Sequence, residues 1–473
     1  MPAATRGAAA KPRKAGASGA RKAAAARQRP LEYHVLLTAT LCLLAFGAVM
    51  VYSSSSARTL LQGQGNGSGY LIKYVMYGAV GLVIMHVLAR DGVSRVHGIT
   101  GPLLVISFVL LVAVHIPHVG VRVNGANRWI GSGPLQFQPS ELMKLALVLY
   151  TATLLAKNPK RMNDLRELAR PLLLVVGAAC LLVLSQPDLG TAMVIGFTTC
   201  ALLVAAGIPL RNLAILGAGA FVLIAFYGIV RPYARARLTS FLDPWGHAAG
   251  SGFQAVQGQI AIGSGGLFGV GPGQSVQKVF YLPEAHTDFI LAVIGEELGV
   301  VGVCALLFLY GLIAYAGLRA AKAARSLYSA LIAVGATALI LSEAVLNVFA
   351  VLGLAPLTGV PLPFVSYGSS SLIVMLASMG LLLNVAAGGT AHVRAVAPAR
   401  APRKRSANAT GKRTVESARK PAAVAQRKRA ADAAPREAAR WDRERSAEQD
   451  RDRRRRDRGA RGAGARGGRR AAG

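Results

Sequence analysis

Ten runs of mostly apolar residues constrain the fold of this chain more than any other feature of its sequence. Each run is close to the roughly 20 residues that a helix needs to cross the hydrocarbon core of a bilayer. Only helices and closed barrels satisfy their backbone polar groups in lipid, and continuous rather than alternating apolar runs favour helices. We therefore expect an all-α polytopic membrane protein with about ten transmembrane helices, at 34–53, 71–89, 101–118, 140–156, 170–186, 190–208, 212–230, 287–317, 327–351 and 366–388.

An even number of spans puts both termini on the same side of the membrane, and the charge of the short loops indicates which side. The loops that would share a side with the termini carry ten basic residues: Arg90, Arg95, Lys157, Lys160, Arg161, Arg166, Arg211, Arg319, Lys322 and Arg325. The loops on the opposite side are longer and carry fewer. We therefore expect cytoplasmic termini and a large extracellular loop at 231–286, between the seventh and eighth helices.

The basic charge of the chain is concentrated in its two ends. The formal net charge is +33, of which residues 1–30 contribute +8, residues 31–390 contribute +8 and residues 391–473 contribute +17. Both ends are rich in Ala, Arg and Lys and lack residues that form a core, so we expect disordered basic tails around one membrane domain at 31–390. We expect these tails to contact anionic membrane lipid, or alternatively a cytoplasmic protein, and we expect no nucleic-acid partner.

The cysteines and histidines indicate neither a disulfide nor a metal site. All four cysteines fall inside predicted spans, and no cluster of His and Cys has the spacing of a zinc site. We therefore expect no metal site and see no evident cofactor, and a requirement for a divalent cation is left open. The sequence also lacks a P-loop, which disfavours a primary transporter.

The segment 281–290, at the outer boundary of the eighth span, carries three ionisable side chains within five residues: Glu284, His286 and Asp288. Thr287 is a candidate N-cap for the helix that follows, and Asp288 would lie in its first turn, where the helix dipole should keep it ionised. Capping alone is the simpler interpretation of Asp288, but capping does not need the other two groups. Because ionisable groups are costly in a bilayer, all three are candidate functional residues.

A second cluster lies around the start of the fourth span. Glu141 and Lys144 are three residues apart and can pair on one helix face, so a buried structural ion pair and a substrate-binding role are both open. Arg128, in the preceding outer segment, could bind a substrate or anchor the chain at the membrane interface. Glu296 and Glu297 lie deeper in the eighth span and must face protein or water, and we expect them to pair with Lys144 or an arginine.

Asp188 and a group of arginines are further candidates on the outer side. Asp188 lies in the turn between the fifth and sixth spans, where it could cap the sixth span or contribute to a site. Arg231, Arg235 and Arg237 open the large extracellular loop. Arginine suits phosphate or pyrophosphate because its planar fork makes paired hydrogen bonds, and anchoring at lipid headgroups is the alternative.

In the segment 356–371, Pro361 and Pro363 break any helix close to the outer face. Irregular backbone at membrane depth is tolerated only where it is buried or lines a cavity. Ser366, Tyr367 and Ser369 supply hydroxyl groups there, with helix capping and small-residue packing as the alternative. Together the five clusters predict one outward-facing cavity, suited to a lipid-linked substrate that carries a phosphate and a sugar.

Six motifs in order along the chain carry a resemblance to the SEDS family, the polytopic membrane proteins of bacterial cell elongation, division and sporulation. The motifs are NRWI at 127–130, QPSE at 138–141, QPDLGT at 186–191, LPEAHTDF at 282–289, GEELG at 295–299 and PLPFVSYG at 361–368. The similarity covers roughly 34–390 and leaves out both tails. The LPEAHTDF and NRWI forms are most similar to the division branch, whereas PLPFVSYG also occurs in the elongation branch.

The resemblance implies a peptidoglycan glycosyltransferase that polymerises lipid II at the outer face of the bacterial cytoplasmic membrane, at the division septum. Its substrates would be lipid II and a polyprenyl-linked glycan. Its implied partners are a class B penicillin-binding protein, which is a transpeptidase, and other divisome membrane proteins. The essential acidic residue of the family falls on Asp288.

A mechanism follows from this resemblance and from the chemistry of the residues. Asp288 would act as the general base that takes the proton of the acceptor sugar hydroxyl, and the three arginines would neutralise the departing pyrophosphate. Inversion at the donor sugar needs one base and no covalent nucleophile. Two other hypotheses use the same cavity or none: a lipid II flippase, and a non-enzymatic scaffold of the divisome.

Overall fold

The computed structural model describes residues 29–63, 66–123, 126–131, 133, 136–157, 169–279 and 281–389. Most of the two predicted basic tails lies outside the described residues. So do Lys160, Arg161 and Arg166, three of the ten basic residues on which the predicted orientation rests. The domain boundaries and the cytoplasmic placement of the termini therefore stay predictions.

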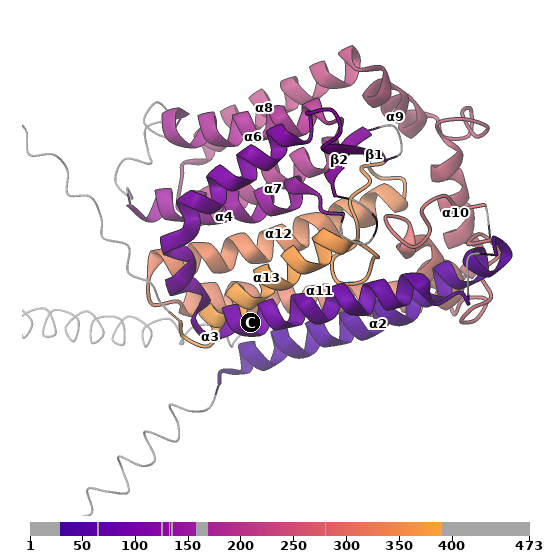
Figure 1. Ribbon diagram of the computed structural model, residues 1–473, viewed down its shortest axis with the longest axis horizontal. Helices are drawn as coiled ribbons and strands as arrows, with labels where there is room; N and C mark the ends of the chain where they lie inside the picture. Colours follow the sequence, from indigo (N-terminus) through magenta and orange to yellow (C-terminus); the bar gives the residue numbers. More distant parts are fainter. Residues whose placement is uncertain are drawn as a thin grey trace, which may run out of the picture. The chain divides into compact units, whose positions relative to one another are not determined.

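Helices form at all ten predicted spans (Figure 1). In the described part of the chain seven helices are long and apolar enough to cross a membrane, and two shorter apolar helices join them. The prediction of a multi-pass helical membrane protein is confirmed. The helices are α2 (Leu31–Leu61), α3 (Gly69–Ala113), α4 (Pro139–Lys157), α6 (Leu174–Ser185, preceded by the π-helical turn η2, Ala169–Leu173), α7 (Leu189–Ala205), α8 (Leu210–Val230), α11 (Ile290–Ala323), α12 (Leu327–Val351) and α13 (Ser369–Ala386).

Helix α3 covers two of the predicted spans, which meet at a kink. The kink lies at Asp91, whose φ of −136° and ψ of 16° are not helical. Asn384 of α13 satisfies backbone groups beside this break: its Nδ2 donates to the carbonyl oxygens of Ala89 at 3.0 Å and Arg90 at 2.9 Å. These two bonds fasten α13 to the point where the two halves of α3 meet, where Arg90 and Asp91 are themselves exposed.

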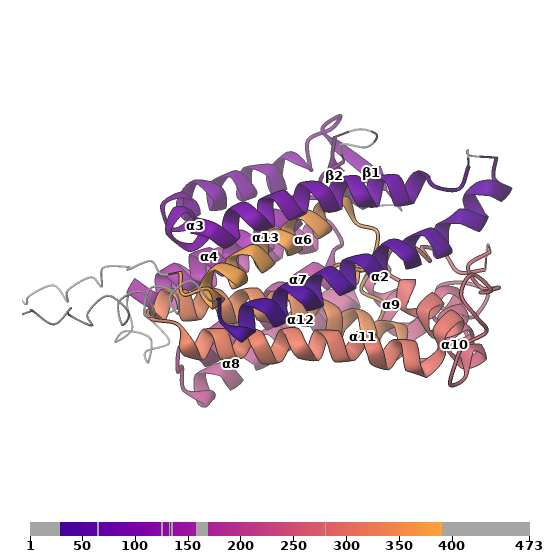
Figure 2. The same ribbon diagram turned by 90° about the horizontal axis from the view of Figure 1, so that it is seen from below.

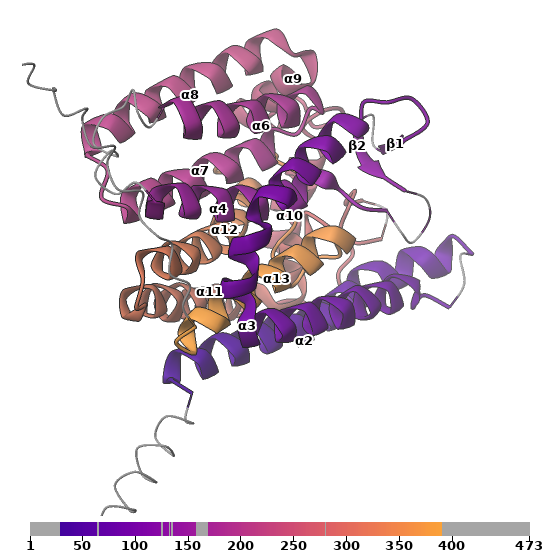
Figure 3. The ribbon, with the colours of Figure 1, turned by 60° about the vertical axis from the view of Figure 1, so that its left-hand side comes forward.

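Helix α13 lies at the centre of the bundle, whereas α8 lies at its edge. It contacts α2, α3, α4, α11 and α12, and Figures 2 and 3 show it between α3 and α12. In the most apolar stretch of each helix, 94% of the residues of α13 are buried, against 6% of those of α8. The exposed apolar side chains of α8, such as Phe221 and Ile229, suit contact with lipid.

Helix α11 is interrupted at Gly299, whose φ of 65° is left-handed. A glycine-rich turn packs into the break: the N–H groups of Val270 and Gly271 donate to the carbonyl oxygens of Glu296 at 2.9 Å and Glu297 at 3.1 Å. A side chain at Gly299 would collide with the backbone of this turn, so only glycine fits there. The GEELG motif therefore joins the segment 231–286, which precedes α11, to this helix.

The predicted pairing of Glu296 and Glu297 with Lys144 or an arginine is wrong. Glu297 forms an ion pair of 2.7 Å with Lys278 and accepts hydrogen bonds from Ser53. Glu296 accepts from the Val276 N–H at 2.9 Å and from a neighbouring serine hydroxyl. Both carboxylates thus bind residues 275–278, because the turn that packs into the helix break brings this segment alongside α11.

The outer segments contain more regular structure than the sequence indicated. The large loop holds α9 (Pro232–Leu242) and α10 (Phe253–Gly265). The all-α prediction also needs one correction, since β1 (Gly120–Val123) and β2 (Ala126–Ile130) form an antiparallel hairpin. In this hairpin, whose two strands Figure 1 labels, Val121 pairs with Trp129.

Replacing Asn384 by leucine should destabilise the fold. The two carbonyl groups beside the Asp91 kink would lose their donor, at a cost of about 0.5–1.5 kcal/mol for each hydrogen bond. Unfolding in mixed micelles measures this loss. Ser378→Ala is the matched control, because the Ser378 hydroxyl bonds only one turn back within α13, to Val374 at 2.9 Å, and its removal should cost less than about 1 kcal/mol. Equal stability of the leucine variant and the wild type would contradict this account of the kink.

Candidate functional site

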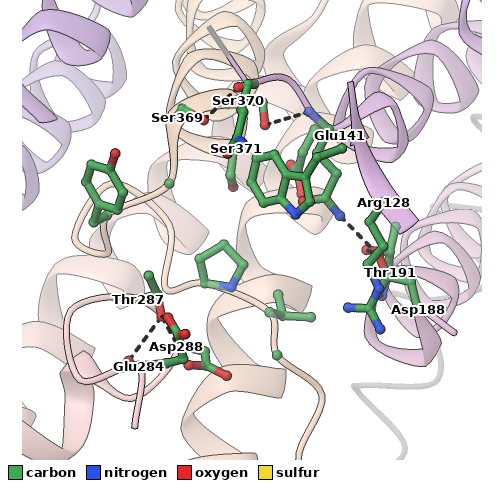
Figure 4. Close-up of a pocket in the computed structure, with 18 of the residues that line it drawn as sticks. Arg128, Glu141, Asp188, Thr191, Glu284, Thr287, Asp288, Ser369, Ser370 and Ser371 are labelled. Atoms are coloured by element: carbon green, nitrogen blue, oxygen red, sulfur yellow. Dashed lines mark hydrogen bonds between the residues drawn. The ribbon is translucent and has the colours of Figure 1, made fainter. Parts of the chain in front are cut away.

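A cavity of about 640 Å³ opens at the end of the bundle where the hairpin, α9 and the 281–290 segment meet. Its lining comes from α3, α4, α7, α9 and α13 and from irregular segments between them. Ten of the thirteen residues predicted for the site line it: Arg128, Glu141, Lys144, Asp188, Arg237, Glu284, His286, Asp288, Tyr367 and Ser369. Figure 4 shows the Glu284–Asp288 segment and the group around Arg128 and Asp188 on different sides of this cavity.

Arg231, Arg235 and Ser366 do not line the cavity. Arg231 and Arg235 are exposed, because the chain continues from α8 almost directly into α9 rather than into a loop. Residues four apart share a helix face, whereas residues two apart point about 200° away from each other, so Arg237 turns inward. Ser366 is buried, and its Oγ accepts the Leu362 N–H at 2.8 Å as part of a turn.

Asp288 lies in the irregular segment before α11, not in its first turn. The helix begins at Ile290 with Phe289 as its N-cap, so the predicted capping by Thr287 is wrong. The Thr287 hydroxyl instead lies 3.1 Å from Glu284 Oε2 and 3.2 Å from Asp288 Oδ1. Its single hydrogen can be donated to only one of these two carboxylates at a time.

The pKa of Asp288 is raised to about 7. Burial is the largest cause, and the charge of Glu284 acts in the same direction, while Arg237, a backbone N–H and the Thr287 hydroxyl lower the pKa. We expected the helix dipole to keep this carboxyl ionised, but burial outweighs it because Asp288 lies outside the helix. A carboxyl that titrates near neutrality can accept a proton at physiological pH.

Arg237 is the basic group beside Asp288. Its Nη1 donates to the Leu357 carbonyl oxygen at 2.7 Å, and its guanidinium lies 4.7 Å from the centre of the Tyr233 ring. A Cβ atom at Gly359 would lie 3.8 Å from Asp288 Oδ2 and 4.0 Å from Arg237 Nη1. The carboxylate and the guanidinium therefore flank the same glycine of the cavity wall.

The opposite wall is a hydrogen-bonded frame. Asp188 caps α7 by accepting the Thr191 N–H at 3.2 Å, which confirms the capping interpretation, and it also accepts from Gln138 at 3.1 Å. Arg128 Nε donates to the Gln186 carbonyl oxygen at 3.0 Å. Asp188 and Arg128 thus fix the turn between α6 and α7 through these hydrogen bonds.

Lys144 lies in the floor of the cavity and pairs with two carboxylates. Its distance to Glu141 is 2.8 Å, which confirms the predicted pair, and it also forms an ion pair with Glu343 of α12. All three side chains are buried, so removing Lys144 would leave two buried carboxylates without their cation. The sequence analysis missed Glu343 because nothing near it in the sequence points to Lys144.

An aromatic cluster forms the wall next to the Asp288 segment. The ring centres of Tyr70 and His286 are 4.3 Å apart, those of Tyr70 and Tyr367 are 5.1 Å apart, and the Tyr367 N–H donates to the His286 carbonyl oxygen at 2.9 Å. Burial lowers the pKa of His286 to about 4 against the opposing charge of Glu284, so the ring is neutral at pH 7. Its neutral state disfavours a role as the cation that binds a phosphate.

The sequence analysis also missed Lys73, which lines the cavity on the second turn of α3. Its side chain is exposed, and its ammonium lies 5.8 Å from the centre of the Tyr70 ring. It escaped notice because it falls within a predicted span. At the start of α13, Ser369 and Ser370 bond to the backbone of Gln136 and Gln138, so these hydroxyls also join α13 to the chain before α4.

Metal-ligating side chains do not gather in the part of the chain that the structure describes: no group of three or more His, Cys, Asp or Glu could hold an ion there. The cavity instead offers carboxylates, the partly or fully exposed cations Arg128, Arg237 and Lys73, hydroxyls and aromatic rings. Such a set can take a proton from a hydroxyl and stabilise a developing negative charge.

Comparison with known proteins places this chain in a known family. The model of the family named for FtsW, RodA and SpoVE, described as cell cycle protein, matches residues 33–390. Stage V sporulation protein E of Bacillus subtilis is 40% identical over 353 residues, which cover 74% of this chain and 96% of the relative. The probable peptidoglycan glycosyltransferase FtsW of Coxiella burnetii is 41% identical over 359 residues, covering 74% and 95%.

A solved structure agrees with these sequence relatives. It is a chain studied for the structural coordination of polymerization and crosslinking by a peptidoglycan synthase complex. The two chains superpose with a TM-score of 0.61 at 33% identity, over 74% of this chain and 96% of the other. On the family match and these similarities, the chain belongs to the FtsW, RodA and SpoVE family of cell cycle proteins.

Proposed function

We propose that this protein is a peptidoglycan glycosyltransferase that polymerises lipid II at the outer face of the cytoplasmic membrane during cell division. The observation that carries the proposal is a carboxyl with a pKa near 7, Asp288, beside Arg237 in an open cavity of a membrane protein. The relative named as a probable peptidoglycan glycosyltransferase supports the reaction class, and its FtsW name supports division over elongation.

In the proposed reaction a sugar hydroxyl of lipid II attacks the anomeric carbon of a polyprenyl-linked glycan. Asp288 takes the hydroxyl proton as the new carbon–oxygen bond forms. The bond from the anomeric carbon to the pyrophosphate breaks, and polyprenyl diphosphate leaves with its electron pair. One base on one face of the donor sugar is sufficient for this inversion, by analogy with inverting glycosidases.

The cations of the cavity have the task of stabilising the leaving pyrophosphate. Arg237 is fixed by Leu357 and Tyr233, so its charge is preorganised and needs no rearrangement during the reaction. Lys73 is exposed beside Tyr70 of the aromatic cluster, and its flexible side chain can follow a mobile anion. These two residues replace Arg231 and Arg235 in the role first expected for the arginines of the extracellular loop.

We infer that the partners are a class B penicillin-binding protein and other membrane proteins of the divisome, at the division septum. The similarity to a chain of a peptidoglycan synthase complex supports a transpeptidase partner. A flippase would use the same cavity without a proton acceptor, so the assay below measures polymer and not lipid movement. If the reaction needs a divalent cation, Glu284 and Asp288 are the neighbouring carboxylates of the cavity that would bind it.

Replacing Asp288 by asparagine should abolish polymerisation while leaving the protein folded. Loss of a general base lowers a rate by about 10²–10⁴-fold. The measurement is glycan formation from lipid II by the purified protein with its cognate penicillin-binding protein. Asp91→Asn is the matched control, because Asp91 is exposed at the α3 kink and its ion-pair partner among the described residues is the exposed Arg95. Polymer formation by the Asp288 variant at the wild-type rate would refute the base assignment.

The rate of polymerisation should rise with pH between about 6 and 8. A carboxyl with a pKa of about 7 is about one tenth ionised at pH 6 and about nine tenths at pH 8, and only the ionised form accepts the proton. Glu284→Gln removes a charge that raises this pKa, so it should move the midpoint to lower pH. A rate that stays constant or falls over this interval would contradict the assignment.

Arg237 and Arg235 form a matched pair on one short helix. Arg237→Gln removes the fixed cation beside the leaving group and should lower kcat/KM by about 10- to 100-fold. It should also move the pH midpoint upward, because Arg237 lowers the Asp288 pKa. Arg235→Gln should change neither quantity, since its side chain is exposed outside the cavity. Equal losses in the two variants would indicate a general effect on α9.

A further inference from the structure

Asn347 of α12 connects two segments of the site without lining the cavity itself. Its Nδ2 donates to the carbonyl oxygen of Asp288 at 2.7 Å and to that of Val360 at 2.8 Å. The side chain is 2% exposed and lies behind the cavity wall. We propose that Asn347 is a positioning residue that holds the Asp288 base at a fixed place relative to the 356–368 wall, an inference that rests on the proposed function.

The chemistry of the side chain fits this task. A primary amide carries two N–H donors on one nitrogen, so a single asparagine can hold two carbonyl oxygens that converge on it. Serine and threonine have one hydroxyl donor, and an ionised aspartate has none. Among the twenty side chains the choice at this position is therefore narrow, because α12 must bind both carbonyls from one point.

The other end of the amide shows that this arrangement has a cost. Asn347 Oδ1 is buried and accepts no hydrogen bond from the residues that the structure describes. A buried acceptor without a partner lowers stability, and native proteins hold few such groups. An asparagine selected for packing alone would be replaced by leucine or methionine at lower cost. Its two donors are the benefit that offsets the unsatisfied oxygen.

The two carbonyls belong to the parts of the site whose separation matters most. Asp288 lies before α11 and Val360 lies in the irregular wall, so neither carbonyl has a partner within a regular helix. Arg237 binds the same wall three residues earlier, at Leu357, and Gly359 lies beside the Asp288 carboxylate. Asn347 thus places the base, the wall and the cation in one frame.

The accuracy of this frame should control the chemical step rather than substrate binding. A general base must come within hydrogen-bond reach of the hydroxyl, and a displacement of about 1 Å can cost about 10²-fold in rate. The wide cavity would still admit the substrate after such a displacement. The expected signature of a lost Asn347 is therefore a lower kcat with little change in KM.

The test compares three substitutions of Asn347 in the full-length protein with its cognate penicillin-binding protein. Asn347→Ala and Asn347→Asp both remove the donors: the alanine leaves a small gap, and the aspartate keeps the shape but sets a carboxyl against the two carbonyl oxygens. Both should lower kcat by about 10- to 100-fold with KM within about threefold. Asn347→Gln keeps two donors on a longer stem and should recover part of kcat.

Ser342→Ala is the control on the same helix. The Ser342 hydroxyl bonds to Leu339 and Thr198, away from the cavity, and its loss should leave kcat and KM unchanged. Losses of kcat in the Ala, Asp and Gln variants that simply follow the drop in their melting temperatures would overturn the proposal, because they would indicate packing alone. Wild-type kcat in Asn347→Ala would overturn it as well.

Hydrogen exchange separates a failure of this inference from a failure of the proposed function. In Asn347→Ala, amides of segments 284–290 and 356–366 should exchange faster together, whereas those of α13 should not change. Unchanged exchange in both segments refutes the coupling whatever the activity. Faster exchange in both, with a folded wild type that makes no polymer, supports the coupling and refutes the proposed reaction.

Discussion

A buried backbone group that leaves a helix needs a hydrogen-bond partner from another segment of this protein, because without one it lowers stability. The structure meets this constraint at three breaks. Asn384 binds carbonyls beside the kink of α3, and a glycine-rich turn binds those at the interruption of α11. Asn347 binds the carbonyls of Asp288 and Val360. The cavity exists because such irregular segments can be held in place.

The electrostatics of the cavity divide its charged residues into two kinds. Lys144 and Asp188 are occupied by buried or frame-forming partners, so they hold the walls together. Asp288 and Arg237 keep groups directed at the open space, and their mutual effects bring the pKa of the carboxyl close to neutrality. Charge in a cavity of a membrane protein is thus not by itself a sign of chemistry. The partners of each group decide its role.

The fold was largely predictable from the sequence, because long apolar runs have few alternatives in a bilayer. Local pairs were predictable as well: Glu141 and Lys144 share a helix face, and Asp188 precedes a helix. Contacts between distant segments were not, as the partnership of Lys144 with Glu343 shows. Arg235 was misplaced because its segment was interpreted as a loop, and a helix turns successive arginines to different sides.

The central place of α13 has a consequence for the biosynthesis of the protein. This helix is the last one that the structure describes, yet it contacts five others, lines the cavity and supplies Asn384 to the kink of α3. The ribosome delivers it after all of them. Helices inserted earlier must therefore stay in the membrane without the central helix and without the Asn384 donor at the α3 kink. The cavity is complete only when α13 has entered.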